Sequence, residues 1–251
     1  MNADQLSTSD RTIRLVKERL EFVEIIDRLN QHFLDPKLIK LTPEGGWTHP
    51  WKYLDALRNY LLLTCFDLLG QPSEFKDFQS WLSAASCGDE REEVQQNLTE
   101  KASVFDSAAE IHRGYLRIYG VRNSFIRFIN HVLTAEARND LLYSVRIRRV
   151  DPVKHMEIEV IESDERKINW LYAVRNAYTH RAENTGSPAG GVFGTVGREL
   201  VVEGKVLKGW EPIAWEPDGK LQIEYSVRDW PQALTNAVTN GLAQRGVNSG
   251  A

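Results

Sequence analysis

The spacing of apolar residues near the N-terminus indicates two long amphipathic helices. Between residues 9 and 34, apolar side chains recur every three to four positions, as on one buried helix face, and they are Ile13, Val16, Leu20, Phe22, Val23, Ile25, Ile26 and Leu29. Asp35-Pro36 ends this segment, because the residue before a proline avoids the helical conformation. A second helix is predicted from Trp51 to Leu69, where Gly70 provides a stop signal.

The segments that follow predict shorter helices separated by turn residues. A loop rich in Pro and Gly over 42–50 separates the first two helices. Beyond the second helix, we expect helices over about 75–85, 92–118 and 121–136, with a polar loop over 86–92. These helices together predict a bundle.

The pattern changes from helical spacing to alternation near residue 143. Residues 143–150 and 155–161 alternate and are rich in β-branched side chains, with Asp151-Pro152 between them. This pattern predicts a β-hairpin over about 143–161. Ser163 can then cap a helix over about 164–182.

The C-terminal region mixes turn-rich and strand-like sequence. Residues 184–197 are rich in Gly, Ser and Thr, and short strand-like runs follow between 199 and 227. A turn is expected at Pro217-Asp218-Gly219. A last helix is predicted from Pro231, because proline suits the first helical position, and it is followed by a frayed tail from Gly246 onward.

Taken together, these elements predict a mainly α fold. A helical bundle is expected over 9–182, with the β-hairpin inserted in it. A small β-containing C-terminal extension is expected over 183–251. Hydrophobic residues make up 42% and charged residues 26% of the 251 residues, which is ordinary for a chain with a buried core.

Charge and cysteine content restrict the classes of function. The formal net charge of -4 argues against broad electrostatic coating of a nucleic acid, although a local basic groove stays open. Cys65 and Cys87 are the only cysteines, and no Cys/His spacing typical of zinc occurs, so no metal and no cofactor is predicted. The N-terminus lacks the apolar segment of a signal peptide, and no run approaches 18 apolar residues. We therefore expect a cytoplasmic protein with no membrane segment.

Two groups of arginines allow alternative interpretations. One group lies on a predicted strand and either forms a solvated face or suits contacts to phosphate: Arg146, Arg148 and Arg149. The other group is interleaved with Tyr and Phe, and it either tracks single-stranded RNA or forms the polar face of a core helix: Arg113, Arg117, Arg122 and Arg127.

The helix over 164–182 carries the segment with the most specific chemistry, Arg175-Asn176-Ala177-Tyr178-Thr179-His180. At about 100° per residue, one stripe of this helix is apolar and should face the core: Trp170, Leu171, Val174, Ala177 and Tyr178. The polar face carries side chains that we do not expect the core to need: Tyr172, Arg175, Asn176, Thr179 and His180.

The spacing of the polar residues suggests how they could work together. Asn176 and His180 are four residues apart and are neighbours on the helix, so the amide can bind one imidazole nitrogen and fix the tautomer. Arg175 and His180 diverge by about 140° around the helix axis. Two copies related by a two-fold axis could bring both arginines and both histidines into one cleft.

The hexapeptide Arg-Asn-Ala-Tyr-Thr-His resembles the R-x4–6-H signature of HEPN domains, in which a polar residue, often Asn, follows the Arg near the end of a late bundle helix. The resemblance covers residues 9–182 loosely and does not include the C-terminal extension. Many HEPN proteins are metal-independent endoribonucleases of toxin–antitoxin, phage-defence and RNA-processing systems, and act as dimers with a composite cleft. The resemblance implies Arg175, Asn176 and His180 as catalytic residues, RNA as substrate, a homodimer, and an antitoxin or regulatory protein as a further partner.

These residue types suit cleavage of RNA without a metal ion. RNA carries its own nucleophile, the 2′-OH, and a histidine can accept its proton or protonate the leaving 5′-oxygen. An arginine can stabilise the charge that develops on the phosphate. Tyr172 and Thr179 lie on the same helix face and are candidates for contacts to the substrate.

Two other interpretations fit the same residues. A HEPN-like bundle can be a non-catalytic module that binds a nucleotide, RNA or a partner protein. Arg175 and His180 can also simply solvate the end of a helix, where cations suit the helix dipole, in a scaffold without a site. The presence of both Arg175 and His180 favours the enzyme, whereas a buried ion pair or an open surface position of these side chains favours the non-catalytic interpretations.

Overall fold

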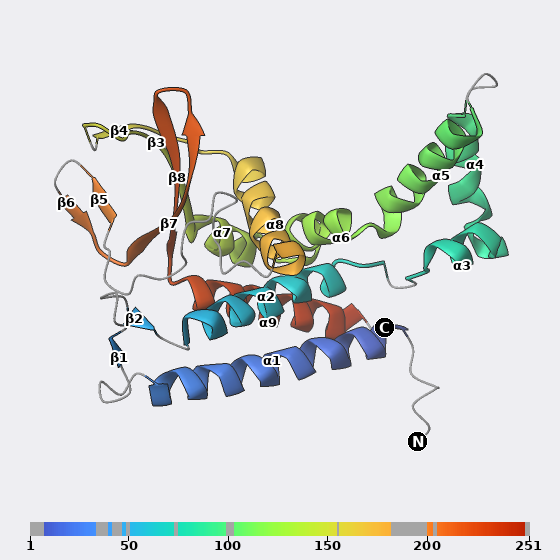
Figure 1. Ribbon diagram of the computed structural model, residues 1–251. Helices are drawn as coiled ribbons and strands as arrows, with labels where there is room; N and C mark the ends of the chain where they lie inside the picture. The colour runs from blue at the N-terminus through green and yellow to red at the C-terminus, as the bar shows by residue number, and fades with distance from the viewer. Residues whose placement is uncertain are drawn as a thin grey trace.

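A computed structural model describes residues 8–33, 40–41, 47–48, 51–72, 75–98, 103–154, 156–181, 200–202 and 205–248. The predicted fold class is confirmed, because the chain is mainly helical and carries a small antiparallel sheet (Figure 1). No described helix combines the length and the apolar character that a membrane crossing requires. The predicted Gly-, Ser- and Thr-rich segment 184–197 lies outside the described residues.

Four long helices form the centre of the molecule: α1 (Thr8–Phe33), α2 (Trp51–Leu69), α8 (Asp164–Arg181) and α9 (Trp230–Asn248). α2 packs against each of the other three (Figure 1). The apolar spacing predicted these helices correctly, since Val16 and Val23 of α1 and Leu62 and Phe66 of α2 are buried. Between α1 and α2, two-residue strands β1 (Lys40–Leu41) and β2 (Trp47–Thr48) pair with each other, and 42–46 lie outside the described residues.

The region between α2 and the first hairpin contains more helices than the sequence predicted: α3 (Phe78–Ser83), a 3-10 turn (Ala85–Cys87), α4 (Gly88–Gln96), α5 (Val104–Tyr119), α6 (Val121–Arg127), a π-helical turn (Phe128–Val132) and α7 (Ala135–Tyr143). The loop predicted over 86–92 is wrong, because α4 begins at Gly88 and its first turn contains Asp89 and Glu90, where carboxylates suit the helix dipole. The single helix predicted over 92–118 is divided, because Ser103 caps α5 by accepting a hydrogen bond from the backbone N–H of Asp106 at 3.1 Å.

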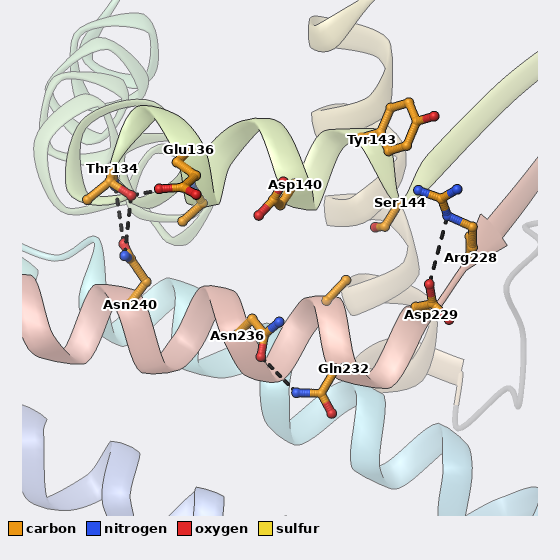
Figure 2. A pocket seen from close by; sticks show the side chains of 12 residues that line it. Thr134, Glu136, Asp140, Tyr143, Ser144, Arg228, Asp229, Gln232, Asn236 and Asn240 are labelled. Carbon is orange, nitrogen blue, oxygen red and sulfur yellow. Dashed lines mark hydrogen bonds and ion pairs between the residues drawn. The ribbon is translucent and has the colours of Figure 1, made fainter.

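The helix predicted over 121–136 is also interrupted. After the π-helical turn, Thr134 caps α7 by accepting a hydrogen bond from the backbone N–H of Ala137 at 3.2 Å. α7 then lies beside α9 (Figure 2).

α3, α4 and α5 build a second, smaller core on the side of the molecule away from the sheet (Figure 1). Its buried members are Trp81, Cys87, Val94, Tyr115 and Tyr119. Glu90 lies between two of the aromatic residues, because Trp81 Nε1 donates to Glu90 Oε2 at 2.7 Å and the Tyr119 hydroxyl donates to Glu90 Oε1 at 3.3 Å. The aromatic residues of this region are therefore part of a hydrophobic core. Arg127 donates to the backbone oxygens of Gly70 and Ile118 at 3.2 and 3.0 Å. These contacts favour the core-helix interpretation over a track for RNA.

Four antiparallel strands form one sheet in the order β4–β3–β8–β7. β3 (Val145–Asp151) and β4 (Met156–Val160) are the predicted hairpin, which is confirmed. β7 (Trp210–Asp218) and β8 (Leu221–Arg228) form a second hairpin at the predicted turn, where Gly219 has a φ of 62° that suits glycine. β5 (Leu200–Val202) and β6 (Lys205–Leu207) pair separately.

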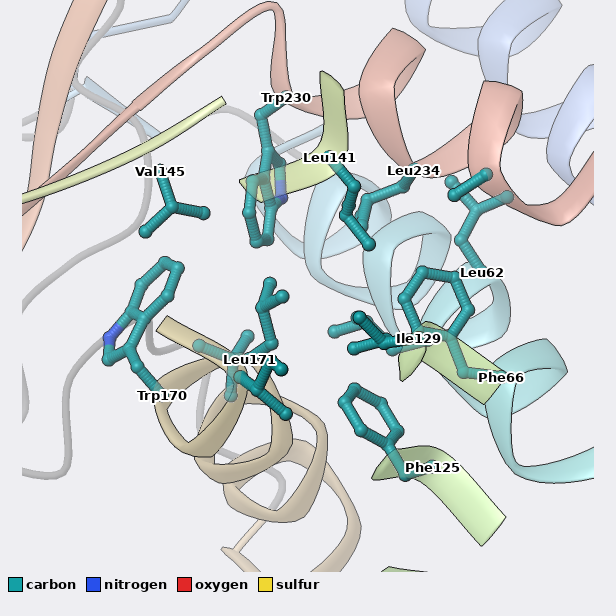
Figure 3. Packing of buried hydrophobic residues seen from close by; sticks show 14 of the residues in the cluster. Leu62, Phe66, Phe125, Ile129, Leu141, Val145, Trp170, Leu171, Trp230 and Leu234 are labelled. Atoms are coloured by element: carbon teal, nitrogen blue, oxygen red, sulfur yellow. The ribbon is translucent and has the colours of Figure 1, made fainter. Parts of the chain in front are cut away.

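The C-terminal region completes the bundle instead of extending it. β8 pairs with β3 from Val145 opposite Val227 to Val150 opposite Gln222. α9 packs against α2, and its side chains enter the main hydrophobic core. Figure 3 shows Trp230 and Leu234 facing residues of α2, α7 and α8. One core therefore spans the predicted division at residue 182, and this division does not match the packing.

The arginines of β3 join neighbouring strands. Their ion pairs are Arg146–Glu157 at 3.0 Å, Arg148–Glu224 at 2.8 Å, Arg149–Glu159 at 2.6 Å and Arg149–Asp218 at 2.7 Å. The Arg148 side chain is only 8% exposed. This group of arginines is engaged within the sheet and does not present a basic surface for phosphate.

Gly241 of α9 lies against Phe128, so a substitution at this position can test how α9 packs on the core. A Cβ at Gly241 would lie 2.3 Å from a ring carbon of Phe128, whose side chain is fully buried. We expect Gly241→Ala to lower the free energy of unfolding by about 1–3 kcal/mol in urea denaturation, because the ring has no space to move into.

Gly246 lies within α9, which ends at Asn248, so the frayed tail predicted from residue 246 is wrong for residues 246–248. Gly246 supplies the matched control, because apart from its neighbours and its own helix backbone no atom lies within 4 Å of the position of a Cβ there. Gly246→Ala should raise the free energy of unfolding by up to about 1 kcal/mol, since alanine is the better helix former. Equal stability of the Gly241→Ala variant and the wild type would contradict the packing of α9 on Phe128.

Candidate functional site

α8 presents the first three residues of the predicted apolar stripe to the core, whereas Ala177 is half-buried and the side chain of Tyr178 lies outside the described residues. The Ser163 hydroxyl accepts a hydrogen bond from the backbone N–H of Arg166 at 3.2 Å, as expected for the predicted cap. Trp170, Leu171 and Val174 are buried in the main core. Trp170 stacks on Tyr225 of β8 with a ring-centroid distance of 5.3 Å, so the sheet fixes the position of this helix.

Arg175 forms an ion pair with Asp67 of α2 in the same chain. Its Nε and Nη2 lie 2.9 and 2.8 Å from Asp67 Oδ2, and its Nη1 donates to Asn176 Oδ1 at 3.2 Å. The two ion-paired side chains are 14% and 8% exposed. Arg175 and Asn176 are thus brought together, and the guanidinium is held against α2.

Asp67 was not identified as part of the site from the sequence. It is the only charged residue in the apolar segment Leu61–Leu69 of α2. A lone carboxylate on a helix segment that is otherwise buried requires a cation or hydrogen-bond donors. This pattern signals a buried partner, but sequence spacing does not show which of the distant cations supplies it.

Asp67 lies in a weakly solvated environment. Burial raises its pKa from 3.8 to about 6, against the opposing effects of Arg175 and then of Arg19 of α1. Arg19 also lies beside Cys65, whose pKa burial raises to about 12. Within the described part of the chain, Asp67 Oδ1 and Arg19 Nη1 are buried without a hydrogen-bond partner. The cluster therefore combines residues of α1, α2 and α8.

Tyr172 packs on the core. Its ring meets Phe125 of α6 edge to face at a centroid distance of 5.4 Å, and the side chain is half-buried. The expectation that the core does not need the polar face of this helix is therefore wrong for Tyr172, and also for Arg175, which pairs with a buried carboxylate. Both residues flank the apolar stripe, where a side chain can reach a neighbouring helix. A contact between Tyr172 and RNA stays a prediction.

α8 continues through Thr179 and His180, as predicted. This places the backbones of Asn176 and His180 one turn apart. The side chains of Thr179 and His180 lie outside the described residues, so their predicted roles stay predictions. Across the described ranges, no three His, Cys, Asp or Glu side chains gather in a way that could hold a metal ion.

The raised pKa of Asp67 gives a pH dependence with a defined sign. A carboxyl with a folded-state pKa of about 6 and an ordinary value of 3.8 binds its proton more tightly in the folded state. Its stabilising contribution is fully present below about pH 4 and is lost as the pH rises through about 6, a change of about 3 kcal/mol. Asp67→Asn should remove this component in urea unfolding measured between pH 4 and 7.

Asp164→Asn is the matched control, since Asp164 pairs with Arg138 at 2.8 Å but its side chain is 56% exposed. This variant should keep the pH dependence of the wild type. An unchanged pH dependence in Asp67→Asn would show that the carboxyl of Asp67 does not titrate in this range.

Comparison with known proteins assigns no family. The chain matches no protein-family model, no curated protein and no solved structure. The functional argument therefore depends on the residues of α8 and their contacts.

Proposed function

We propose that this protein is a metal-independent endoribonuclease of the HEPN type that cleaves RNA in a cleft shared by two copies of the chain. The observation that supports this proposal is the fixed guanidinium of Arg175, on a helix that carries Asn176 next to it and His180 one turn further on. An arginine that is held before substrate binds loses little conformational freedom in the transition state.

The chemistry needs only groups of the protein and of the RNA. The 2′-oxygen attacks the neighbouring phosphorus, and the bond from phosphorus to the 5′-oxygen breaks. The His180 of one copy accepts the 2′ proton, the His180 of the other copy protonates the leaving 5′-oxygen, and Arg175 stabilises the charge on the phosphate. The products are a 2′,3′-cyclic phosphate and a 5′-OH. Asp67 Oδ2 contacts Nε and Nη2 of Arg175, and Nη1 donates to Asn176 Oδ1, so any contact with phosphate would take place in the presence of these partners.

The biological setting follows from the resemblance to HEPN domains. We propose a cytoplasmic toxin or phage-defence effector that acts as a homodimer and is restrained by an antitoxin or another regulatory protein. Asn176 orients His180, and Thr179 and Tyr172 are the candidates for further contacts to RNA.

A second function is favoured by the burial of Arg175. Arg175 lies in an ion pair with Asp67 and its side chain is 14% exposed, and a buried ion pair is the arrangement that favours a non-catalytic interpretation. In this alternative, the chain is a non-catalytic HEPN-like module that binds a nucleotide, RNA or a partner protein. The two functions differ in whether His180 is required for RNA cleavage.

The test is cleavage of structured and unstructured RNA in EDTA by the wild type and by His180→Ala. We expect wild-type cleavage with cyclic-phosphate ends, and a loss of about 100- to 10,000-fold in the variant, the usual contribution of a general acid or base. Equal cleavage by both proteins would contradict the assignment of His180. No cleavage by either protein would favour the binding module.

Arg175 needs a variant that does not leave a buried charge unpaired. Removing one member of a buried ion pair costs about 3–5 kcal/mol of stability, so Arg175→Ala alone would confuse folding with catalysis. The combined variant Arg175→Gln with Asp67→Asn removes both charges and should lose at least about 100-fold in cleavage rate while it stays folded. Arg122→Ala is the matched control, because Arg122 also precedes an Asn but is exposed and contacts Asn169. It should cleave like the wild type.

A further inference from the structure

A trough between α7 and α9 is lined by residues that have no part in the proposed ribonuclease site. Its volume is about 520 Å³. Ala137 of α7 and Ala233 of α9 both line it, and their small side chains leave space between the two helices. An open space of this size can hold a small molecule or one side chain of a partner.

Internal contacts define both ends of the trough (Figure 2). At one end, the backbone N–H of Thr134 donates to Asn240 Oδ1 at 3.2 Å, and Asn240 Nδ2 donates to Thr134 Oγ1 at 3.3 Å. At the other end, the guanidinium of Arg228 lies 4.6 Å from the ring centroid of Tyr143 and 5.3 Å from that of Trp210. The space between these ends suits an elongated ligand.

The charge of the lining favours a cation. The described lining carries three carboxylates, those of Glu136, Asp140 and Asp229, and one cation, Arg228, which leaves an excess of two negative charges. Arg228 is stacked on two rings, and its Nε lies 3.8 Å from Asp229. Among the described residues, none forms a hydrogen bond or ion pair with the carboxylate of Asp140, which Figure 2 shows beside the space between the helices. This lining repels phosphate and attracts positive charge.

The remaining polar groups suit an organic cation. Gln232 Nε2 donates to Asn236 Oδ1 at 2.7 Å, which leaves the carbonyl oxygen of Gln232 as an acceptor on the α9 wall. A primary ammonium group has three donors and no acceptor, so a carboxylate and an amide carbonyl together can satisfy it. A bare metal ion fits less well, since the described carboxylates do not gather into a metal-binding group. The two alanines offer an apolar surface for an aliphatic chain.

We propose that this trough binds a primary ammonium group carried on an aliphatic chain. Two sources share this chemistry: a free polyamine and a lysine side chain of a partner protein. The inference does not depend on ribonuclease activity, because its evidence and its test concern binding alone.

The test titrates the isotope-labelled full-length protein with spermidine and, separately, with a short acetylated peptide of alternating lysine and glycine. We expect saturable shifts of the backbone amide signals of Ala137 and Ala233. The combined variant Glu136→Gln with Asp140→Asn should weaken binding about tenfold, the effect of removing two exposed charge contacts. Ala233→Leu keeps every charge but fills the trough, and it should weaken binding at least as much.

Glu92→Gln with Glu93→Gln on α4 is the matched control, because it removes the same charge from an exposed helix outside the trough. This variant should keep the wild-type affinity within about twofold, because neither carboxylate lines the trough. Saturable binding of spermidine alone assigns the trough to a polyamine, and tighter binding of the peptide assigns it to a lysine of a partner. The proposal is overturned if neither probe saturates, or if the control variant loses as much affinity as the trough variant.

Discussion

The buried carboxylate of Asp67 is the constraint on which the arrangement of the central helices depends. A carboxylate in the apolar part of α2 is stable only when a cation accompanies it into the interior. Arg175 of α8 is that cation, with two contacts to one carboxylate oxygen, and Arg19 of α1 adds a further positive charge nearby. The arginine of the hexapeptide Arg175-Asn176-Ala177-Tyr178-Thr179-His180 is therefore also the residue that ties α8 to α2. Any functional role of Arg175 has to operate in the presence of this ion pair.

The position of Arg175 also depends on the C-terminal part of the chain. Trp170, slightly more than one turn before Arg175 on α8, stacks on Tyr225 of β8 and contacts Trp230 at the start of α9. β8 in turn pairs with β3, which precedes α8 in the sequence. The helix that carries the motif is thus held from one side by α2 and from the other by elements that come more than 40 residues later. A fragment ending after α8 would lose these contacts, so the region beyond residue 182 belongs to the folding unit of the site.

The parts of this structure that the sequence predicted are those set by local spacing. The boundaries of α2 follow from its apolar run and from Gly70, and the first hairpin follows from alternation around Asp151-Pro152. The sequence did not predict two long-range pairings. One is the pairing of β3 with β8, and the other is the ion pair of Asp67 with Arg175, which are 108 residues apart. Apolar and charge patterns show that a strand or a carboxylate needs a partner, but many distant segments satisfy that need equally well. For the same reason the hexapeptide was found from the sequence, whereas Asp67 was not.

Electrostatics place a further condition on RNA binding. Many arginines in the described part of the chain make intramolecular contacts. Those of β3 pair with carboxylates, and Arg127 and Arg245 donate to backbone oxygens. The trough between α7 and α9 is acidic, and the net charge of the chain is -4. The arginines that make these contacts therefore add little positive charge for RNA. Two copies joined near the end of α8 would double the local charge and set an arginine of one chain beside a histidine of the other, which the divergence of about 140° prevents within one helix. A dimer of this kind would both increase the positive charge near the RNA and bring an arginine and a histidine together. For these two reasons we place the proposed reaction at a cleft shared by two copies.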